Sequence, residues 1–229
     1  MTVLNVKGDA ARAFAIMRAG GIAILPNDVG YSLIAGEAQA LRKIFDTKRR
    51  APTKLNAMLG NADHHREIHN TGTRAKEIVE AITVDYDLPL GIIAPCRRDH
   101  PMLSRLDPDT YQRSTAGDTL LMLVNAGRFH AEITRLSFET GYLLFGSSAN
   151  LSLTGTKFHA RDIEPEIRAI ADIVVDYGLM KYHPWAASST LLDVENLTVH
   201  RVGVAYENIH DILARHFKIE LPEPPARKP

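Results

Sequence analysis

The chain has 229 residues, of which 27 are basic and 27 acidic, so its formal net charge at pH 7 is zero. That length suits one domain with a well-buried core, and the charge balance argues against a chain-wide attraction to nucleic acid, while leaving a local basic patch open. The single cysteine, Cys96, excludes an intrachain disulfide. Neither an apolar signal core nor a run of roughly 18 apolar residues occurs, which predicts a cytoplasmic protein without a membrane span.

Apolar residues at helical spacing alternate with short apolar runs along the first half of the chain. In order, they predict a helix over 9–19, a strand over 22–25, a helix over 37–49, a strand over 55–59, a helix over 73–82 and a strand over 90–95. The segment PNDVGYSL after the first strand carries turn residues. Cys96 follows the last of these strands and is interpreted as a small core residue in preference to a nucleophile.

The second half of the chain contains more predicted strands than helices. In order, it predicts a strand over 119–124, a helix over 128–141, strands over 142–148, 170–176, 188–194 and 197–203, and a closing helix over 206–217. Early alternation followed by late strands favours one α/β domain over residues 1–217, with a twisted, mixed parallel and antiparallel sheet flanked by helices. Residues 218–229 are rich in proline and charge and are predicted to form a disordered tail.

Common catalytic and cofactor motifs are missing from the sequence. There is no G-x-G-x-x-G after a strand, no Walker A pattern and no G-x-S-x-G elbow, because GSSAN ends in Asn150. His65 and His69 have the i, i+4 spacing of a helical metal site but no obvious third ligand. An exposed polar helix face is therefore the favoured interpretation, and no metal ligand is assigned.

Two short polar segments remain, and their chemistry is complementary. Lys48, Arg50 and Lys54 lie between a predicted helix and a predicted strand, and the run SSANLS at 147–152 directly follows a predicted strand. Lysine and arginine suit phosphate oxygens, while serine hydroxyls and an asparagine amide can bind phosphate, ribose or a base edge. A nucleotide-phosphate pocket is one interpretation. The other is a basic helix C-terminus beside an N-cap turn, neither of which needs a ligand.

These segments resemble the YrdC-like family, whose best-known members are threonylcarbamoyl-AMP synthases and which includes YciO and YwlC relatives. The family's Lys-x-Arg and Ser-x-Asn tetrad falls on Lys48, Arg50, Ser148 and Asn150, and its second serine on Ser152. Other positions in register with the family are Pro26, Asp28, Tyr31, Leu33, Ser189, Thr190, Asp193, Arg201 and Gly203. The resemblance covers residues 8–215 and implies a single YrdC-like domain.

The chain also departs from the family pattern, so it resembles a divergent member. The family's Pro-Thr-Asp-Thr-Val-Tyr-Gly-Leu stretch is changed in this chain at Asn27, Val29, Gly30 and Ser32. Its Gly-Pro-x-Thr stretch has Gly91 at the threonine, and its Val-x-Val-Arg-x-Pro strand appears as LLMLVN, without arginine or proline. Because that arginine would be the natural partner of a substrate carboxylate, we expect a retained nucleotide half and a rebuilt acceptor half of the site.

The resemblance implies an enzyme that joins L-threonine or another amine, bicarbonate and ATP into a carbamoyl-adenylate and releases pyrophosphate, as in the tRNA threonylcarbamoyladenosine pathway. Lys48 and Arg50 would be catalytic. The implied nucleotide-binding residues are Lys48, Arg50, Lys54, Ser148, Asn150, Ser152 and Arg201. The implied acceptor pocket contains Asp28, Tyr31, Ser189 and Thr190. Mg²⁺ would screen the phosphates without an assigned protein ligand.

Two other functions remain open on the sequence. Arg42, Lys43, Arg49 and the cations beside them could bind the backbone of double-stranded RNA or tRNA without synthase activity. The zero net charge and the few aromatic residues count against that function. The chain could also be an inactive paralogue that acts through a partner protein, such as a component of a tRNA-modification complex.

Overall fold

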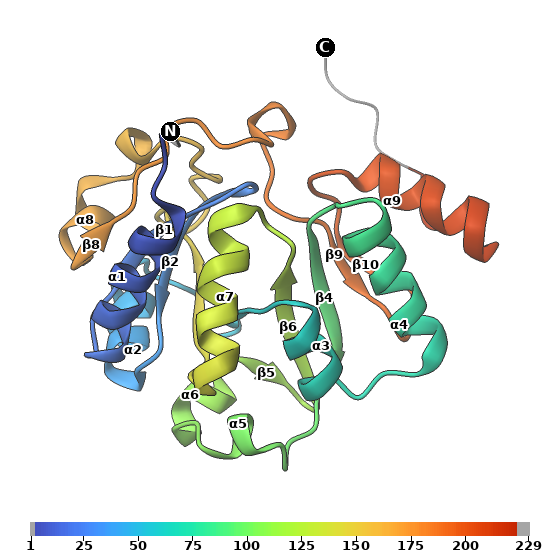
Figure 1. Ribbon diagram of the computed structural model, residues 1–229, viewed down its shortest axis with the longest axis horizontal. Helices are drawn as coiled ribbons and strands as arrows, with labels where there is room; N and C mark the ends of the chain where they lie inside the picture. Colours follow the sequence, from blue (N-terminus) through green and yellow to red (C-terminus); the bar gives the residue numbers. More distant parts are fainter. Residues whose placement is uncertain (1–2, 224–229) are drawn as a thin grey trace.

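The computed structural model of the chain describes residues 3–223, within which ten strands form one sheet (Figure 1). The strands are β1 (Ala23–Asn27), β2 (Gly30–Ala35), β3 (Ala57–Leu59), β4 (Leu90–Pro95), β5 (Thr115–Ala116), β6 (Thr119–Val124), β7 (Leu144–Ser148), β8 (Ile173–Val174), β9 (Leu191–Asp193) and β10 (Thr198–Arg201). Their order is β10-β9-β4-β6-β3-β7-β2-β1-β8, with β5 paired to β6. The pairs β1–β8, β3–β6 and β4–β9 are parallel and the others antiparallel, which confirms the predicted mixed sheet.

Helices connect the strands and flank the sheet. They are α1 (Val6–Arg18), α2 (Ala38–Thr47), α3 (Ala62–Ile68), α4 (Thr73–Glu80), α5 (Pro101–Ser104), α6 (Pro108–Gln112), α7 (Arg128–Thr140), α8 (Pro165–Ala169) and α9 (Tyr206–Ile212). Short π-helical turns extend α4 to Asp85 and α9 to Phe217, and two 3₁₀ turns cover Ala160–Asp162 and His183–Trp185. Among residues 3–223, no helix combines the length and hydropathy that crossing a bilayer requires.

Both faces of the sheet are packed, because successive strand residues point to opposite faces. On one face, Leu33, Met58 and Met122 belong to a buried cluster that includes residues of α2, α4 and α9. On the other face, Ile34 and Leu59 belong to a cluster with residues of α1 and α7. Figure 1 shows α7 lying across the middle of the sheet. The face of Ile34 and Leu59 is also the one that carries the cavity described below.

The structure adds strand β2, which the sequence does not separate from the turn before it. Asn27 pairs with Gly30, so Asp28 and Val29 form a two-residue hairpin loop. Gly30 has a φ of +115°, a conformation that glycine adopts without steric cost. All six residues of β2 are buried. A strand that is buried on both faces lacks the alternation of polar and apolar residues by which it could be predicted.

The C-terminal segment differs from its prediction over the residues that the structure describes. Ile219 and Leu221 are buried within the core cluster of α4 and α9. The Tyr206 hydroxyl donates a hydrogen bond to the Pro222 carbonyl oxygen at 2.5 Å. Burial of these two apolar side chains therefore holds 218–223 against the domain, in place of a disordered tail from residue 218. The rest of that predicted tail, 224–229, lies outside the described residues.

The segment with His65 and His69 is not the exposed polar face expected from the sequence. α3 turns both side chains inward, with exposed fractions of 3% and 0%. Their Nδ1 atoms share a hydrogen bond of 2.8 Å, and His69 Nε2 lies 3.1 Å from the Leu120 carbonyl oxygen. Within 3–223, no group of three or more His, Cys, Asp or Glu side chains is placed to hold a metal ion. The pair therefore forms part of the packed interior.

Buried histidines make the stability of the fold sensitive to acid. Burial lowers the pKa of His64 and His65 to about 4, and that of His69 and His130 to about 3, from an ordinary value of 6.5. Below pH 6.5 the unfolded chain therefore binds protons that the folded chain does not. The free energy of unfolding should fall as the pH falls, by about 1.4 kcal/mol for each of these histidines between pH 7.5 and 5.5.

Urea unfolding at pH 7.5, 6.5 and 5.5 measures this dependence. His130→Leu should reduce the loss of stability at low pH, because it removes one of the buried titrating groups. His183→Gln, at an exposed histidine, should leave the dependence unchanged. Equal free energies of unfolding at pH 7.5 and 5.5 would contradict the prediction.

Candidate functional site

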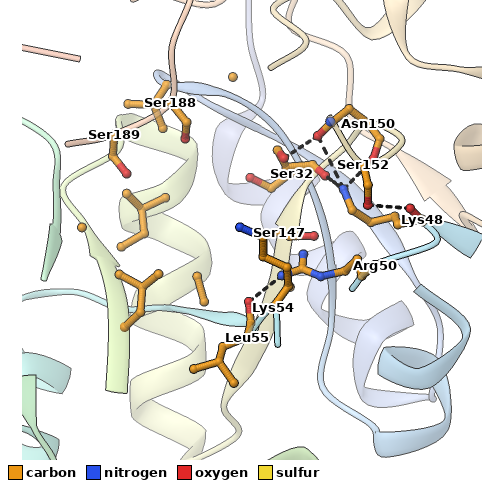
Figure 2. A pocket seen from close by; sticks show the side chains of 18 of the residues that line it. Ser32, Lys48, Arg50, Lys54, Leu55, Ser147, Asn150, Ser152, Ser188 and Ser189 are labelled. Carbon is orange, nitrogen blue, oxygen red and sulfur yellow. Dashed lines mark hydrogen bonds between the residues drawn. The ribbon is translucent and has the colours of Figure 1, made fainter. Parts of the chain in front are cut away.

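A cavity of about 490 Å³, here called the sheet cavity, lies over the face of the sheet that carries Ile34 and Leu59. Its walls come from four parts of the chain, namely 29–32 at the start of β2, 48–55 after α2, 146–155 around the end of β7, and 188–191 with Arg201. Figure 2 shows Lys48, Arg50 and Asn150 on one side and Ser188 and Ser189 on the other. Its volume is in the range of small-molecule sites, roughly 300–1,000 Å³.

The basic residues at the end of α2 point in different directions, two toward the sheet cavity and one toward solvent. Lys48 is the C-cap residue of α2 and is buried, with 2% of its surface exposed. Arg49 has a left-handed φ of +51°, and its exposed guanidinium lies 3.5 Å from Glu166 Oε2 at the rim of the sheet cavity. This reversal of the chain brings Arg50 back to the wall of the cavity. Lys48 and Arg50 are thus the inward members of the basic segment.

The Lys48 side chain holds the turn that follows β7. Its Nζ donates to the carbonyl oxygens of Ser148 and Asn150, the latter at 2.6 Å, and lies 3.5 Å from Asn150 Oδ1. In return, Ser152 donates to the Lys48 carbonyl oxygen through its backbone N at 3.2 Å and its Oγ at 2.7 Å. The three donors of the ammonium therefore face three oxygens of the turn. This geometry makes Lys48 a positioning residue for the turn.

The sheet cavity has buried positive charge without a carboxylate to balance it. Burial, helped by the charge of Arg50, lowers the pKa of Lys48 to about 7, and Glu164 opposes this shift. The three oxygen acceptors favour the ammonium over the neutral amine, which has only two N–H donors. Burial also lowers the pKa of Arg50. No Asp or Glu lines the described wall of the sheet cavity, so an anionic ligand would supply the missing charge.

Arg50 and Ser147 keep hydrogen-bonding capacity that the protein does not use. Arg50 Nη2 donates to the Leu55 carbonyl oxygen at 2.6 Å, and the guanidinium lies 5.9 Å from the centre of the Phe45 ring. Within the described residues, neither Arg50 Nε nor Ser147 Oγ, both buried, has a hydrogen-bond partner. Both residues line the sheet cavity, where Figure 2 draws them. An unpaired buried polar group costs about 1–3 kcal/mol, so two at one wall indicate a ligand contact.

The Ser-Asn turn is ordered by its own contacts. Ser148 Oγ donates to Asn150 Oδ1. The loop beyond the turn is tied to Glu164, whose Oε1 accepts from Thr154 Oγ1 at 2.7 Å and lies 2.8 Å from Lys157 Nζ. Burial alone would raise the pKa of Glu164, but these bonds lower it to about 2, so the carboxylate is charged at neutral pH. The turn is therefore preorganised, which reduces the entropic cost of binding.

The opposite wall of the sheet cavity carries Arg201 and Ser189. Arg201 donates to the Ser189 carbonyl oxygen through Nε at 3.0 Å and Nη2 at 2.8 Å. Its Nη2 also lies 3.3 Å from Ser189 Oγ. Nη1 makes no hydrogen bond or ion pair with the described residues. This side of the site therefore offers one free guanidinium NH₂ group, Nη1, while Ser189 fixes the rest of the guanidinium.

Tyr31 is among the residues that line the sheet cavity, while its hydroxyl is engaged elsewhere. The Tyr31 hydroxyl contacts Asp176 Oδ1 and the Gly178 carbonyl oxygen, each at 2.9 Å, and accepts from the Tyr177 backbone N at 3.0 Å. Burial raises the pKa of this hydroxyl. Tyr31 therefore anchors the segment 176–178 and is not free to donate a proton to a ligand.

Asp28 and Thr190, both expected to border the acceptor pocket, are not among the residues that line the sheet cavity. Asp28 lines a second cavity, with its Oδ2 3.8 Å from Lys181 Nζ, and burial raises its pKa. Asp28 lies away from the sheet cavity because it belongs to the hairpin loop beyond the end of β1. Thr190 Oγ1 donates to the Val204 carbonyl oxygen at 3.0 Å and accepts from the Gly203 backbone N at 3.1 Å. Thr190 therefore joins the loop before α9 to the sheet.

The sheet and the sheet cavity together define a single-domain α/β protein whose candidate ligand site combines buried cations with a serine-rich turn. The family model for Sua5, YciO and YrdC, described as telomere recombination, matches residues 15–203. Because this match covers most of the chain, the protein belongs to the Sua5/YciO/YrdC family. No protein of curated function matches the sequence.

Solved structures agree with this fold. A hypothetical protein from Streptococcus mutans UA159 matches with a TM-score of 0.75 and 17% identity, over 91% of this chain and 92% of that one. P. abyssi Sua5 complexed with L-threonine has a TM-score of 0.72 and 17% identity, over 90% of this chain and 58% of that one. E. coli YciO has a TM-score of 0.63 and 17% identity, over 86% and 90%. At these identities the likeness shows the fold, and the chain spans little more than half of that Sua5 chain.

Proposed function

We propose that the chain binds ATP in the sheet cavity and joins bicarbonate to a small amine or amino acid, giving a carbamoyl-adenylate and pyrophosphate. The observation that carries the proposal is the unbalanced charge of Lys48 and Arg50 beside the unpaired Arg50 Nε and Ser147 Oγ. A polyphosphate supplies negative charge and acceptor oxygens together. Family membership supports the reaction class, and the relative solved with L-threonine supports a small amino acid as acceptor.

In the proposed reaction the amine and bicarbonate give a carbamate and water. One carbamate oxygen then forms a bond to the α-phosphorus of ATP, the bond from that phosphorus to the bridging oxygen breaks, and pyrophosphate leaves. Such an in-line displacement needs positioning and charge stabilisation, without a covalent protein intermediate. Arg50 and Lys54 would contact the phosphates directly. Lys48 would contribute its charge and hold Ser148, Asn150 and Ser152 in place.

Mg²⁺ belongs to this proposal as a companion of the nucleotide. Among the described residues, no cluster of acidic or histidine side chains offers it a site, and no carboxylate lines the described cavity wall. The phosphates and water would therefore bind the ion, as is usual where Mg²⁺ accompanies a triphosphate. Its role there is to screen the charge that develops on the leaving pyrophosphate.

A pyrophosphate-release assay with ATP, bicarbonate and single amino acids tests the reaction. We expect release to require all three substrates, and to be at least about tenfold slower with L-threonine than with the best amino acid, because Leu121, Leu123 and Leu191 line the cavity. Binding of AMP without release for any amine would indicate the inactive paralogue. RNA binding with a steep salt dependence, unaffected by ATP, together with no binding of AMP, would indicate an RNA-binding function in place of the synthase.

A further inference from the structure

The floor of the sheet cavity is a row of residues that crosses the sheet. Arg201 on β10 pairs with Leu191 on β9, Leu191 pairs with Gly91 on β4, and Gly91 pairs with Leu123 on β6, which pairs with Leu59 on β3. Directly paired residues point to the same face of a sheet. The row therefore begins at Arg201, passes Leu191 and Gly91, and ends at Leu123 and Leu59.

The residues of this row leave an apolar surface for a ligand. A Cβ atom at Gly91 would lie 2.2 Å from Leu191 Cδ2, so the glycine lets the Leu191 side chain lie over β4. Leu191 and Leu121 are only half-buried, although both line the sheet cavity. Half-buried leucines at the bottom of a cavity gain free energy when an apolar group covers them. Lys48, Arg50 and Asn150 line one side of the cavity, and Ser188 and Ser189 line the other.

We infer that the acceptor is an α-amino acid with a branched apolar side chain, whose carboxylate binds Arg201 and whose side chain lies on Leu121, Leu123 and Leu191. This inference rests on the proposed function, which places the phosphates at Arg50 and Lys54. The two ends of the cavity carry cations and the described wall has no carboxylate, so two anionic groups fit, one at each end. The free Nη1 of Arg201 is the donor for the carboxylate.

The same geometry assigns Arg201 to the acceptor and not to the nucleotide. The Arg201 side chain folds back over the sheet toward β4, because its Nη2 lies 3.3 Å from Ser189 Oγ, and a Cβ atom at Gly91 would lie 3.2 Å from that same oxygen. Gly91 pairs with Leu123, about 4.8 Å away on the next strand. An amino acid with its carboxylate at the Arg201 guanidinium reaches the leucines with its side chain and leaves its amine toward the phosphate end. L-threonine, of similar shape, would place a hydroxyl on leucine and lose that contact.

Calorimetric titration of the full chain saturated with AMP tests the inference without needing turnover. L-isoleucine should bind at least about tenfold more tightly than L-threonine, and L-isoleucinol, which lacks the carboxylate, should bind at least about tenfold more weakly than L-isoleucine. Equal affinity for isoleucine and threonine, or no binding of either in the presence of bound AMP, would overturn the inference alone. Failure of the wild-type chain to bind AMP would instead remove the proposed function.

Two variants assign the contacts. Leu121→Ser should weaken isoleucine binding at least about fivefold, and Arg201→Gln at least about tenfold, with AMP affinity within twofold of wild type in both. Leu179→Ser, at an exposed leucine of the second cavity, is the matched control and should bind isoleucine like wild type. A loss of AMP affinity in Leu121→Ser or Arg201→Gln would show that the nucleotide occupies this floor. The ratio of the wild-type chain's affinities for isoleucine and threonine tests the inference even if a variant does not fold.

Discussion

Arg50→Ala should lower the affinity for AMP and the rate of pyrophosphate release by at least about a hundredfold, since each charge-assisted hydrogen bond is worth about 1.5–3 kcal/mol. Arg50 is the inward cation with an unused donor, because its Nε has no partner among the described residues. Its Nη2 is already fixed by the Leu55 carbonyl oxygen at 2.6 Å, which sets the plane of the guanidinium. A ligand therefore meets a donor that is oriented before binding.

Two comparison variants separate charge from geometry at this position. Arg50→Lys keeps the charge but loses the planar fork, so we expect a loss of about tenfold. Arg42→Ala removes an exposed arginine of α2 that pairs with Asp109 and does not line the sheet cavity, and it should remain within twofold of wild type. AMP titration and the pyrophosphate assay provide the measurements. An AMP affinity of Arg50→Ala within threefold of wild type would exclude Arg50 from the nucleotide site.

Lys48→Met should destabilise the fold and weaken AMP binding together. Without the ammonium, the carbonyl oxygens of Ser148 and Asn150 lose a buried donor, which should lower the free energy of unfolding by about 3 kcal/mol. For a chain of this size that corresponds to a fall in Tm of about 6–12 °C. AMP affinity should fall at least about tenfold, because the turn that carries Ser148 and Asn150 is no longer held against α2.

Thermal unfolding followed by circular dichroism, with AMP titration below the transition, measures both effects. Lys43→Met, at an exposed lysine of the same helix, is the matched control and should change neither quantity. Arg50→Ala should show the large loss of affinity with a smaller change in Tm. An unchanged Tm in Lys48→Met would mean that Lys48 does not hold the turn, and would leave it only the role of a charge.

The sequence predicts those elements whose burial follows a simple period. In α1 the buried residues Ala10, Ala13, Phe14 and Met17 recur at helical spacing, and the helix is found where that spacing places it. β2 is buried throughout and shows no such period. The histidines of 64–69 predict a polar helix face, but they are buried. The Nδ1 atoms of His65 and His69 contact each other, while His65 Nε2 has no hydrogen-bond partner among the described residues. The spacing of apolar residues indicates which face of an element is buried, but it does not indicate which polar side chains are buried with it.

For the candidate site too, the sequence predicts some features and not others. The resemblance to the family's tetrad predicts that Lys48, Arg50, Ser148 and Asn150 meet, and the structure places all four at the sheet cavity. Their separate roles were not predictable. Counting the donors of Lys48 requires the positions of the three oxygens that it faces. The floor could not be predicted either, since its row of residues crosses five paired strands and its leucines come from β9, β6 and β3.

The contact between Lys48 and the turn has a consequence for how the protein matures. The two sides of this contact are separated by about a hundred positions in the chain, as Ser152 and Lys48 are 104 residues apart. During synthesis α2 and its cations emerge first, and until β7 follows, Lys48 is an ordinary solvated lysine. If the proposed function holds, we therefore expect nucleotide affinity only once the sheet is complete. A fragment that stops before residue 144 has the cations but lacks the turn that Lys48 contacts. A proteolytic cut inside 148–152 should abolish ligand binding at the sheet cavity while leaving most of the core intact.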